Sequence, residues 1–292
     1  IRQDGKAGRN MKKYLTIDIG GTFIKYSIME ENYRVLEEGS IPTKKEPELF
    51  LTQLTTLAVE HKEKVDGIAV CIAGFINPQT GENTDFSVGE HFRAYNLKEE
   101  LERISGLAVT IENDSNCAAL GEMVAGAGRD YKDICLLTIG TGIGGAIVID
   151  GHLWRGSHFK AGEAGLMRLG RENSEYAGAT SVLVKRVSKV AGKTVDGPYV
   201  FEHLLEPEVA AVYQDWLEKL SAVVGNMAML LDPQVVLIGG GICQEPRFIR
   251  DLKAKVYELY PHLLEYTEIE GCETGNQAGR IGALALHKEE MV

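Results

Sequence analysis

DIGGT at residues 18–22 and TIGTGIGG at residues 138–145 are two glycine-rich turns, each between apolar runs of strand character. The flanking runs are residues 14–17 and 23–28 for the first turn and residues 134–137 and 146–149 for the second. The sequence therefore predicts the same object twice, a β-hairpin whose turn carries few side chains. Glycine there allows positive φ angles and leaves N–H groups uncovered, and such groups bind phosphate. Two such turns predict a nucleotide held between two similar lobes.

The composition excludes several classes of function. The chain has 292 residues, enough for two lobes with cores of their own. A net charge of −11 and a pI of about 5.2 argue against a basic surface for nucleic acid or anionic membranes. No stretch approaches the length of a membrane span. The five scattered cysteines are typical of small core residues in a reducing cytosol, so we expect a cytoplasmic protein.

Strand-like and helical patterns alternate along the chain. The strand-like runs are residues 14–19, 23–29, 33–38, 65–72, 108–112, 133–139, 144–150, 234–238 and 267–271. The helical patterns are residues 48–62, 97–105, 115–127, 207–231, 246–260 and 277–287. In the longest of them, an apolar stripe runs from Tyr213 to Leu230. This alternation predicts an α/β protein with mixed sheets flanked by helices.

The same pass along the chain predicts a division into two lobes. We expect a small lobe at residues 11–112, completed by a helix at 276–292, and a large lobe at 113–275. Met11 is interpreted as the natural start, which makes residues 1–10 a leader or an expression remnant. The polar, irregular stretch at residues 168–179 is expected to be a surface insertion.

Side chains around the first turn suit a nucleotide with its metal ion. Asp18 ends the first strand, where a carboxylate can hold Mg²⁺ directly or through water. Thr22 adds a hydroxyl group and Lys25 a positive charge. A solvated hairpin is the alternative, but the recurrence of the pattern in the second half favours phosphate binding. The predicted nucleotide contacts are Asp18, Gly20, Gly21, Thr22, Lys25, Thr138, Gly140, Thr141, Gly142 and Gly144.

The segment IENDSN at residues 111–116 follows a strand and opens a helix. Phosphoryl transfer needs an acceptor for the hydroxyl proton, and the helix dipole keeps a carboxylate at this position ionised. Asp114 is therefore a candidate general base, and Asn113 offers a donor and an acceptor to sugar hydroxyls. Asp, Asn and Ser are also the preferred N-cap residues, and this segment by itself favours capping.

Two further segments give weaker signals. In KAGEAG, residues 160–165, small neighbours would let Glu163 accept hydrogen bonds from vicinal hydroxyl groups. In residues 235–241, a buried strand precedes Gly239, Gly240 and Gly241, where the backbone could pass close to an adenine or a ribose. An exposed glutamate and an ordinary loop are the respective alternatives.

The ordered set of motifs from Met11 to Val292 resembles the ROK family of sugar kinases, which have the two-lobed actin/hexokinase-like ATPase fold. The motifs are DIGGTFIK (18–25), AGFINPQTG (73–81), ENDSNCAALGE (112–122), LTIGTGIGGAIVIDG (137–151), AGEAG (161–165), VLIGGGI (236–242) and NQAGRIGAL (276–284). The resemblance implies that Asp114 is the catalytic base and that ATP is the phosphoryl donor. It also implies sugar contacts at Asn113, Glu163, Gly74 and Asn77.

One departure from the family pattern bears on the substrate. Many ROK proteins have a histidine after A-G-E-x-G and then a cysteine-rich zinc motif, whereas this chain has Leu166 and no cysteine between Cys135 and Cys243. We therefore predict no zinc site. Leu166 makes the reducing-end side of the pocket more apolar, which resembles the branch that phosphorylates β-glucosides.

The predicted function is ATP- and Mg²⁺-dependent phosphorylation of a small-molecule sugar, at the 6-hydroxyl of a β-glucoside such as cellobiose. The alternatives are a glucokinase, an N-acetylmannosamine kinase, and a sugar-sensing ROK regulator without a DNA-binding domain. An actin-like structural ATPase is remote, because it would lack the sugar-binding Asn-Asp and Ala-Gly-Glu segments. The resemblance also predicts a homodimer, and the acidic composition argues against nucleic acid or a membrane as partner.

Overall fold

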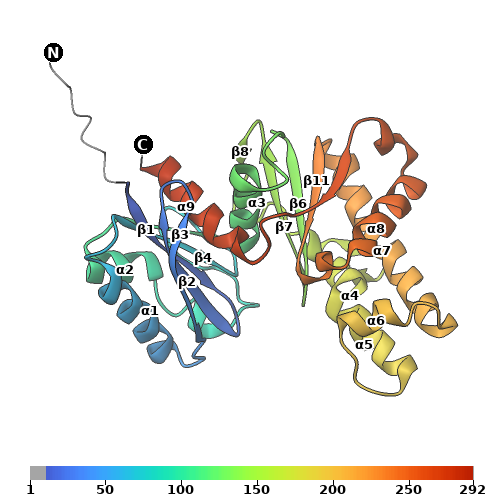
Figure 1. Ribbon diagram of the computed structural model, residues 1–292, viewed down its shortest axis with the longest axis horizontal. Coiled ribbons are helices and arrows are strands. Elements are labelled where there is room, and N and C mark those ends of the chain that lie inside the picture. Colours follow the sequence, from blue (N-terminus) through green and yellow to red (C-terminus); the bar gives the residue numbers. More distant parts are fainter. Residues whose placement is uncertain (1–10, 292) are drawn as a thin grey trace, which may run out of the picture. The chain divides into compact units, whose positions relative to one another are not determined.

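The structure is a computed structural model that describes residues 11–291 (Figure 1). The chain forms two compact units. One unit consists of two stretches, the chain up to Asp114 and the chain from Ala283 onward. The other unit extends from Ser115 to Gly282. The predicted leader at residues 1–10 lies outside the described residues. Among residues 11–291, no helix is both long and apolar enough to cross a bilayer.

The first unit is built on a five-stranded sheet in the order β3-β2-β1-β4-β5. Its strands are β1 (Lys13–Ile19), β2 (Phe23–Glu30), β3 (Val35–Pro42), β4 (Gly67–Ile72) and β5 (Val109–Asn113). The chain passes antiparallel through β1, β2 and β3, whereas β4 and β5 run parallel to β1. Ile19 pairs with Ile72, and Ile72 with Asn113, so the segments after these residues leave the sheet at one edge.

Helices with apolar faces complete the first unit. They are α1 (Pro47–His61), α2 (Leu97–Ser105), the 3₁₀ helix η1 (Glu90–Phe92) and the end of α9 (Ala278–Glu290). Phe50, Leu54 and Leu101 are fully buried, because the apolar positions of α1 and α2 recur at helical spacing and face the core. Gly106 ends α2 with a φ of 73°, directly after the predicted helical range of residues 97–105.

The second unit repeats the plan of the first, with a sheet in the order β12-β11-β6-β7-β8. Its strands are β6 (Ile134–Ile139), β7 (Ile143–Ile149), β8 (His152–Leu153), β11 (Val235–Gly239) and β12 (Glu268–Gly271). The β6–β7 hairpin takes the place of β1–β2, and β11 and β12 run parallel to β6. The predicted doubling of the strand–turn–strand unit is therefore confirmed.

Helices and a small hairpin make up the rest of the second unit. The helices are α3 (Asp114–Ala125), α4 (Ser174–Gly178), α5 (Thr180–Ala191), α6 (Gly197–Glu202), α7 (Pro207–Leu231) and α8 (Pro246–Leu259). The 3₁₀ helices are η2 (Ala164–Leu166), η3 (Gly241–Gln244), η4 (Pro261–Glu265) and η5 (Gly275–Gln277), and the small hairpin joins β9 (Arg168–Leu169) to β10 (Glu172–Asn173). α3 belongs to this unit from Ser115 onward.

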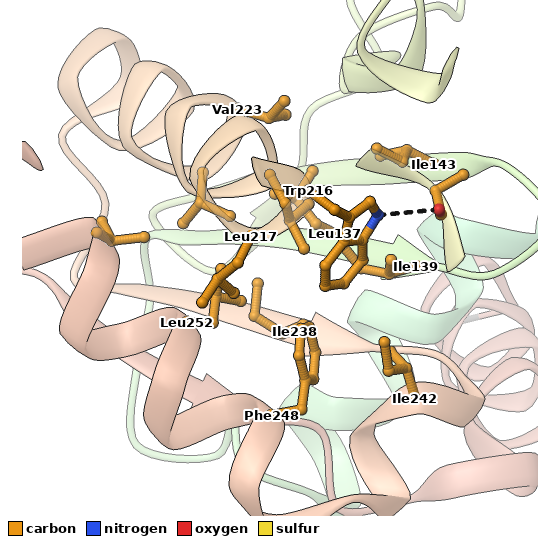
Figure 2. Close-up of a cluster of buried hydrophobic side chains, with 14 of the residues drawn as sticks. Leu137, Ile139, Ile143, Trp216, Leu217, Val223, Ile238, Ile242, Phe248 and Leu252 are labelled. Atoms are coloured by element: carbon orange, nitrogen blue, oxygen red, sulfur yellow. Dashed lines mark hydrogen bonds between the residues drawn. The ribbon is translucent and has the colours of Figure 1, made fainter. Parts of the chain in front are cut away.

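The larger core packs α7 and α8 against the second sheet. Figure 2 shows Trp216 of α7 among Leu137 and Ile139 of β6 and Phe248 of α8. Trp216 is fully buried, and its indole Nε1 donates to the carbonyl oxygen of Ala179 at 3.0 Å. The predicted stripe of α7 is buried from Tyr213 through Met227, but Leu230, in the last turn, is 77% exposed.

Two expectations about the second unit were wrong. Residues 168–179 are not simply a surface insertion, because Ser174, Ala177 and Gly178 are buried in α4, which packs on α7. In addition, no helix was expected at residues 180–191, where α5 lies. Its residues are rich in β-branched side chains that disfavour helices, and packing of Leu183 and Val187 in the core overrides that preference.

Candidate active site

The first glycine turn is fastened by the segment that follows β3. The N–H of Gly20 donates to the carbonyl oxygen of Phe23 at 3.0 Å, which closes the turn. Thr43 makes two hydrogen bonds to the turn. Its N–H donates to Thr22 O at 2.9 Å, and its hydroxyl donates to Gly20 O at 2.8 Å. The Lys45 ammonium donates to Gly21 O. The sequence analysis missed Thr43 and Lys45, since nothing in the local pattern connects them to a turn some twenty residues earlier.

The second glycine turn connects β6 and β7 and has little room for side chains on one side. The N–H of Gly140 donates to Gly142 O at 2.9 Å. A Cβ atom on Gly142 would lie 2.5 Å from Glu175 Oε2, and one on Gly144 would run into the hydroxyl oxygens of Ser115 and Thr138. A Cβ atom on Gly140 would meet nothing within 4 Å, so the tip of the turn is open.

The expectation that the glycines of these turns adopt positive φ angles was wrong. Gly20, Gly21, Gly140 and Gly142 are not among the described glycines with positive φ. They matter through the absence of a side chain, which leaves open space beside Gly21 and Gly140 and allows close packing at Gly142.

Asp18 and Lys25 lie opposite each other at the end of the β1–β2 hairpin. They are register partners, and both are half-buried. Carboxylate oxygens are preferred ligands of Mg²⁺, so Asp18 fits the role of holding a nucleotide-bound ion. Within residues 11–291, no cluster of three or more His, Cys, Asp or Glu side chains is arranged to hold a metal ion by itself.

The residues predicted to contact sugar in the first unit come together at the carboxyl edge of its sheet. Asn113 ends β5, and its Nδ2 amide donates to Gly74 O at 3.0 Å. Gly74 has a φ of 120°, a conformation that favours glycine. Asn77 Oδ1 accepts from the N–H of Gln79 at 3.1 Å and so turns the loop. Asp114 is the exposed first residue of α3.

Asn83 is a structural residue of this loop that the sequence analysis missed. It is buried, and its Nδ2 amide donates to Ala73 O at 3.0 Å and to Phe92 O at 3.3 Å. Its Oδ1 would collide with a Cβ atom on Gly74. Asn83 thus fixes the backbone around Gly74, whose carbonyl oxygen accepts from Asn113, and only the fold reveals this long-range contact.

Glu163 lies in a loop that packs closely on β7. Gly162 has a φ of 88°, and a Cβ atom there would lie 2.7 Å from the carbonyl oxygen of Gly145. Glu163 is half-buried and lines a cavity of about 480 Å³ together with Lys160 and the exposed indole of Trp154. This cavity combines a carboxylate, an ammonium group and an aromatic face, and the rest of its wall is largely apolar, with Met167, Met227 and Leu231 among the lining residues.

Two cavities of the second unit meet at the glycine run, because Gly241 lines both and Gly239 and Gly240 line one of them. Gly239 pairs with Thr138 of β6, which aligns the glycine run with the second turn. A cavity of about 420 Å³ on one side has apolar walls from Val184, Phe201 and Ile242. A cavity of about 330 Å³ on the other side is lined by Thr138, the three glycines and residues 272–276 of the chain after β12, among others.

Two cysteines line the smaller of these cavities, but burial makes their thiols poor nucleophiles. Burial raises the pKa of the Cys243 thiol to about 12 and raises the pKa of Cys272 as well. Cys243 Sγ donates to Ile238 O at 3.2 Å. Both residues therefore act as small packing groups.

Comparison with known proteins identifies relatives that span the whole site. The sequence model of the ROK family matches residues 14–290. A β-glucoside kinase of Listeria innocua is 35% identical over 291 residues, which is 93% of this chain and 96% of that protein. A glucokinase of Halalkalibacterium halodurans is 30% identical and covers 95% of each chain.

A solved structure agrees with this chain over nearly its full length. The ROK family protein from Streptococcus pneumoniae in complex with sucrose superposes with a TM-score of 0.85 and is 30% identical. The match covers 96% of this chain and 100% of that one. The fold predicted from the ordered motifs is therefore confirmed.

Proposed function

This chain belongs to the ROK family and is an ATP-dependent carbohydrate kinase, and we propose that its acceptor is the 6-hydroxyl group of a β-glucoside such as cellobiose. Each unit supplies part of the required chemistry. The first unit carries Asp114, Asn113 and the first glycine turn, and the second carries Glu163 and the second turn.

In the proposed reaction, Asp114 accepts the proton of the sugar hydroxyl as its oxygen attacks the γ-phosphorus atom. A bond forms between the sugar oxygen and phosphorus, the bond from phosphorus to the β,γ-bridging oxygen breaks, and ADP leaves. The start of α3 favours the anionic form of Asp114 through the helix dipole. Mg²⁺, held through Asp18, supplies charge neutralisation on the phosphates when bound.

The apolar cavity beside Gly241 is the proposed site of the adenine base. Its walls at Val184, Phe201 and Ile242 suit a flat aromatic ring, and it continues to Gly140 and Thr141 at the tip of the second turn. From there the phosphates would reach the tip of the second glycine turn, where Gly140 leaves open space.

Leu166 is the observation that carries the choice of a β-glucoside. It is 56% exposed, and its N–H donates to Glu163 O at 3.1 Å within the same turn of η2. An exposed leucine beside a sugar-binding carboxylate favours a second ring or an apolar aglycone over a free reducing end. The disaccharide in the similar S. pneumoniae protein supports an acceptor of this size.

An ADP-release assay across cellobiose, gentiobiose and glucose tests this substrate class. We expect kcat/KM for the β-linked disaccharides to exceed that for glucose by about 10-fold or more. L166H should reduce that ratio by about 10-fold, because it restores a polar group at the reducing end. L205H places the same change at a residue that is 95% exposed, and it should leave the ratio unchanged. A clear wild-type preference for glucose would instead favour the glucokinase alternative.

A further inference from the structure

Glu122 of α3 is fully buried, and its carboxylate accepts four hydrogen bonds. Oε2 accepts from the N–H of Ala127 at 2.8 Å and from the N–H of Glu273 at 3.0 Å. Oε1 accepts from the N–H of Thr274 at 2.8 Å and from the Thr274 hydroxyl. Hydrogen bonds to a charged acceptor are the stronger kind, so this carboxylate fastens residues 273–274 to α3.

The fastened segment forms one wall of the cavity beside the glycine run. Cys272, Glu273, Gly275 and Asn276 line this cavity of about 330 Å³, and Gly239–Gly241 line it as well. The segment leads into α9, whose start packs tightly against α3. A Cβ atom on Gly121 would run into the carbonyl oxygen of Ala278. The wall is thus held at Glu122 and again at Ala278, the first residue of α9.

We propose that Glu122 is a positioning residue for nucleotide binding. It does not touch the nucleotide; it sets the distance between residues 273–276 and the glycine run that the nucleotide passes. This inference rests on the proposed function, which places the adenine in the cavity of about 420 Å³. It takes the cavity of about 330 Å³, which shares Gly241 and Gln244 with the first, to be part of the same nucleotide site.

The variant E122Q tests this role with little change in shape. The glutamine amide would direct its own N–H groups at backbone N–H donors, so at least one side of the carboxylate would lose its partners. We expect the Kd for ADP, measured by calorimetry, and the KM for ATP to rise about 10-fold. The KM for the sugar should stay within about twofold.

Glu112 offers a matched control at the other end of the same motif. It is also buried, but it lies in β5 of the first unit and accepts from the N–H of Asn113 at 2.8 Å. E112Q should raise the KM for the sugar and leave the Kd for ADP within about twofold. A general loss of folding would alter both constants in both variants. The positioning role instead predicts that E122Q changes mainly the Kd for ADP and that E112Q changes mainly the KM for the sugar.

Thr274 provides a second test that keeps the charge. T274V removes one donor to Glu122 and should raise the Kd for ADP about threefold, while T274S keeps the hydroxyl and should restore it. Wild-type ADP affinity in both E122Q and T274V would overturn the inference. ADP binding by the wild type without sugar-dependent turnover would refute the proposed function, and the binding comparison would still decide the role of Glu122.

Discussion

Asp114 carries the chemical step in this account, because it is the exposed carboxylate at the start of α3, next to Asn113. D114N keeps the size and the capping ability of the side chain but removes the basic oxygen. We expect kcat to fall about 10³-fold, as for the loss of a general base, while the sugar dissociation constant changes less than about threefold. Steady-state kinetics and calorimetry measure the two quantities. A variant with near wild-type kcat would reduce Asp114 to a helix cap.

His287 gives the first unit a predictable dependence on pH. It is buried in α9, its Nδ1 lies 3.2 Å from Thr110 Oγ1, and its ring contacts Tyr14 edge-on. Burial, aided by the charges of Lys98 and Lys12, lowers the His287 pKa to about 4 from its usual value of 6.5. The folded state therefore binds a proton less readily than the unfolded state between these pH values.

Stability should accordingly fall as the pH drops from 6.5 toward 4. For this one group the loss between pH 7 and pH 5 is about 2 kcal/mol. Urea unfolding at several pH values measures it, and H287Q should flatten the dependence over this range. H158Q, at an exposed histidine, serves as the control and should keep the wild-type slope. An unchanged slope in H287Q would contradict the assignment.

Candidate residues defined by a local sequence pattern could be singled out from the sequence. Residues whose role depends on distant contacts could not. Asp114 and Asn113 could be singled out because a strand end, a helix start and a carboxylate coincide in one short segment. Asn83 and Glu122 could not, because their partners are known only once the chain is folded.

At the scale of elements, the loop after β11 depends on the backbone conformation of Gly240. Its φ is 105°, and a Cβ atom would run into the carbonyl oxygen of Ile139. G240A should weaken ADP binding about 10-fold and lower the melting temperature, because strain and collision displace the loop. Calorimetry and thermal unfolding measure both effects.

The neighbouring Gly241 supplies the comparison for stability. A Cβ atom there would meet nothing within 4 Å, so G241A should retain the wild-type melting temperature. Equal melting temperatures for G240A and G241A would show that the positive φ of Gly240 is not a constraint.

The elements themselves were largely predictable where the pattern is strong. All strands of the two sheets except the short β8, and the long helices α1, α7 and α8, lie where hydrophobic periodicity places them. The failures are short or atypical elements: α4 and α6 have few turns, and α5 is rich in β-branched residues. α4 and α5 form because α7 offers them an apolar surface, and α6 packs against α5, effects that their own sequences do not encode.

At the scale of the whole molecule, the repeated glycine turns correctly indicated two sheets with the same strand plan. The resemblance further predicts a homodimer, and light scattering after size exclusion measures it directly. The expected mass is twice the 32.0 kDa of one chain. A species of 32.0 kDa at micromolar concentration would contradict this prediction.

The most direct test of the central claim is the identity of the product formed from cellobiose and ATP, determined by phosphorus–proton correlation NMR. The account predicts stoichiometric ADP and a phosphate ester on the 6-oxygen of the non-reducing glucose ring, formed by the wild type and not by D114N. A phosphate at another position, or ADP release that does not depend on the sugar, would contradict it.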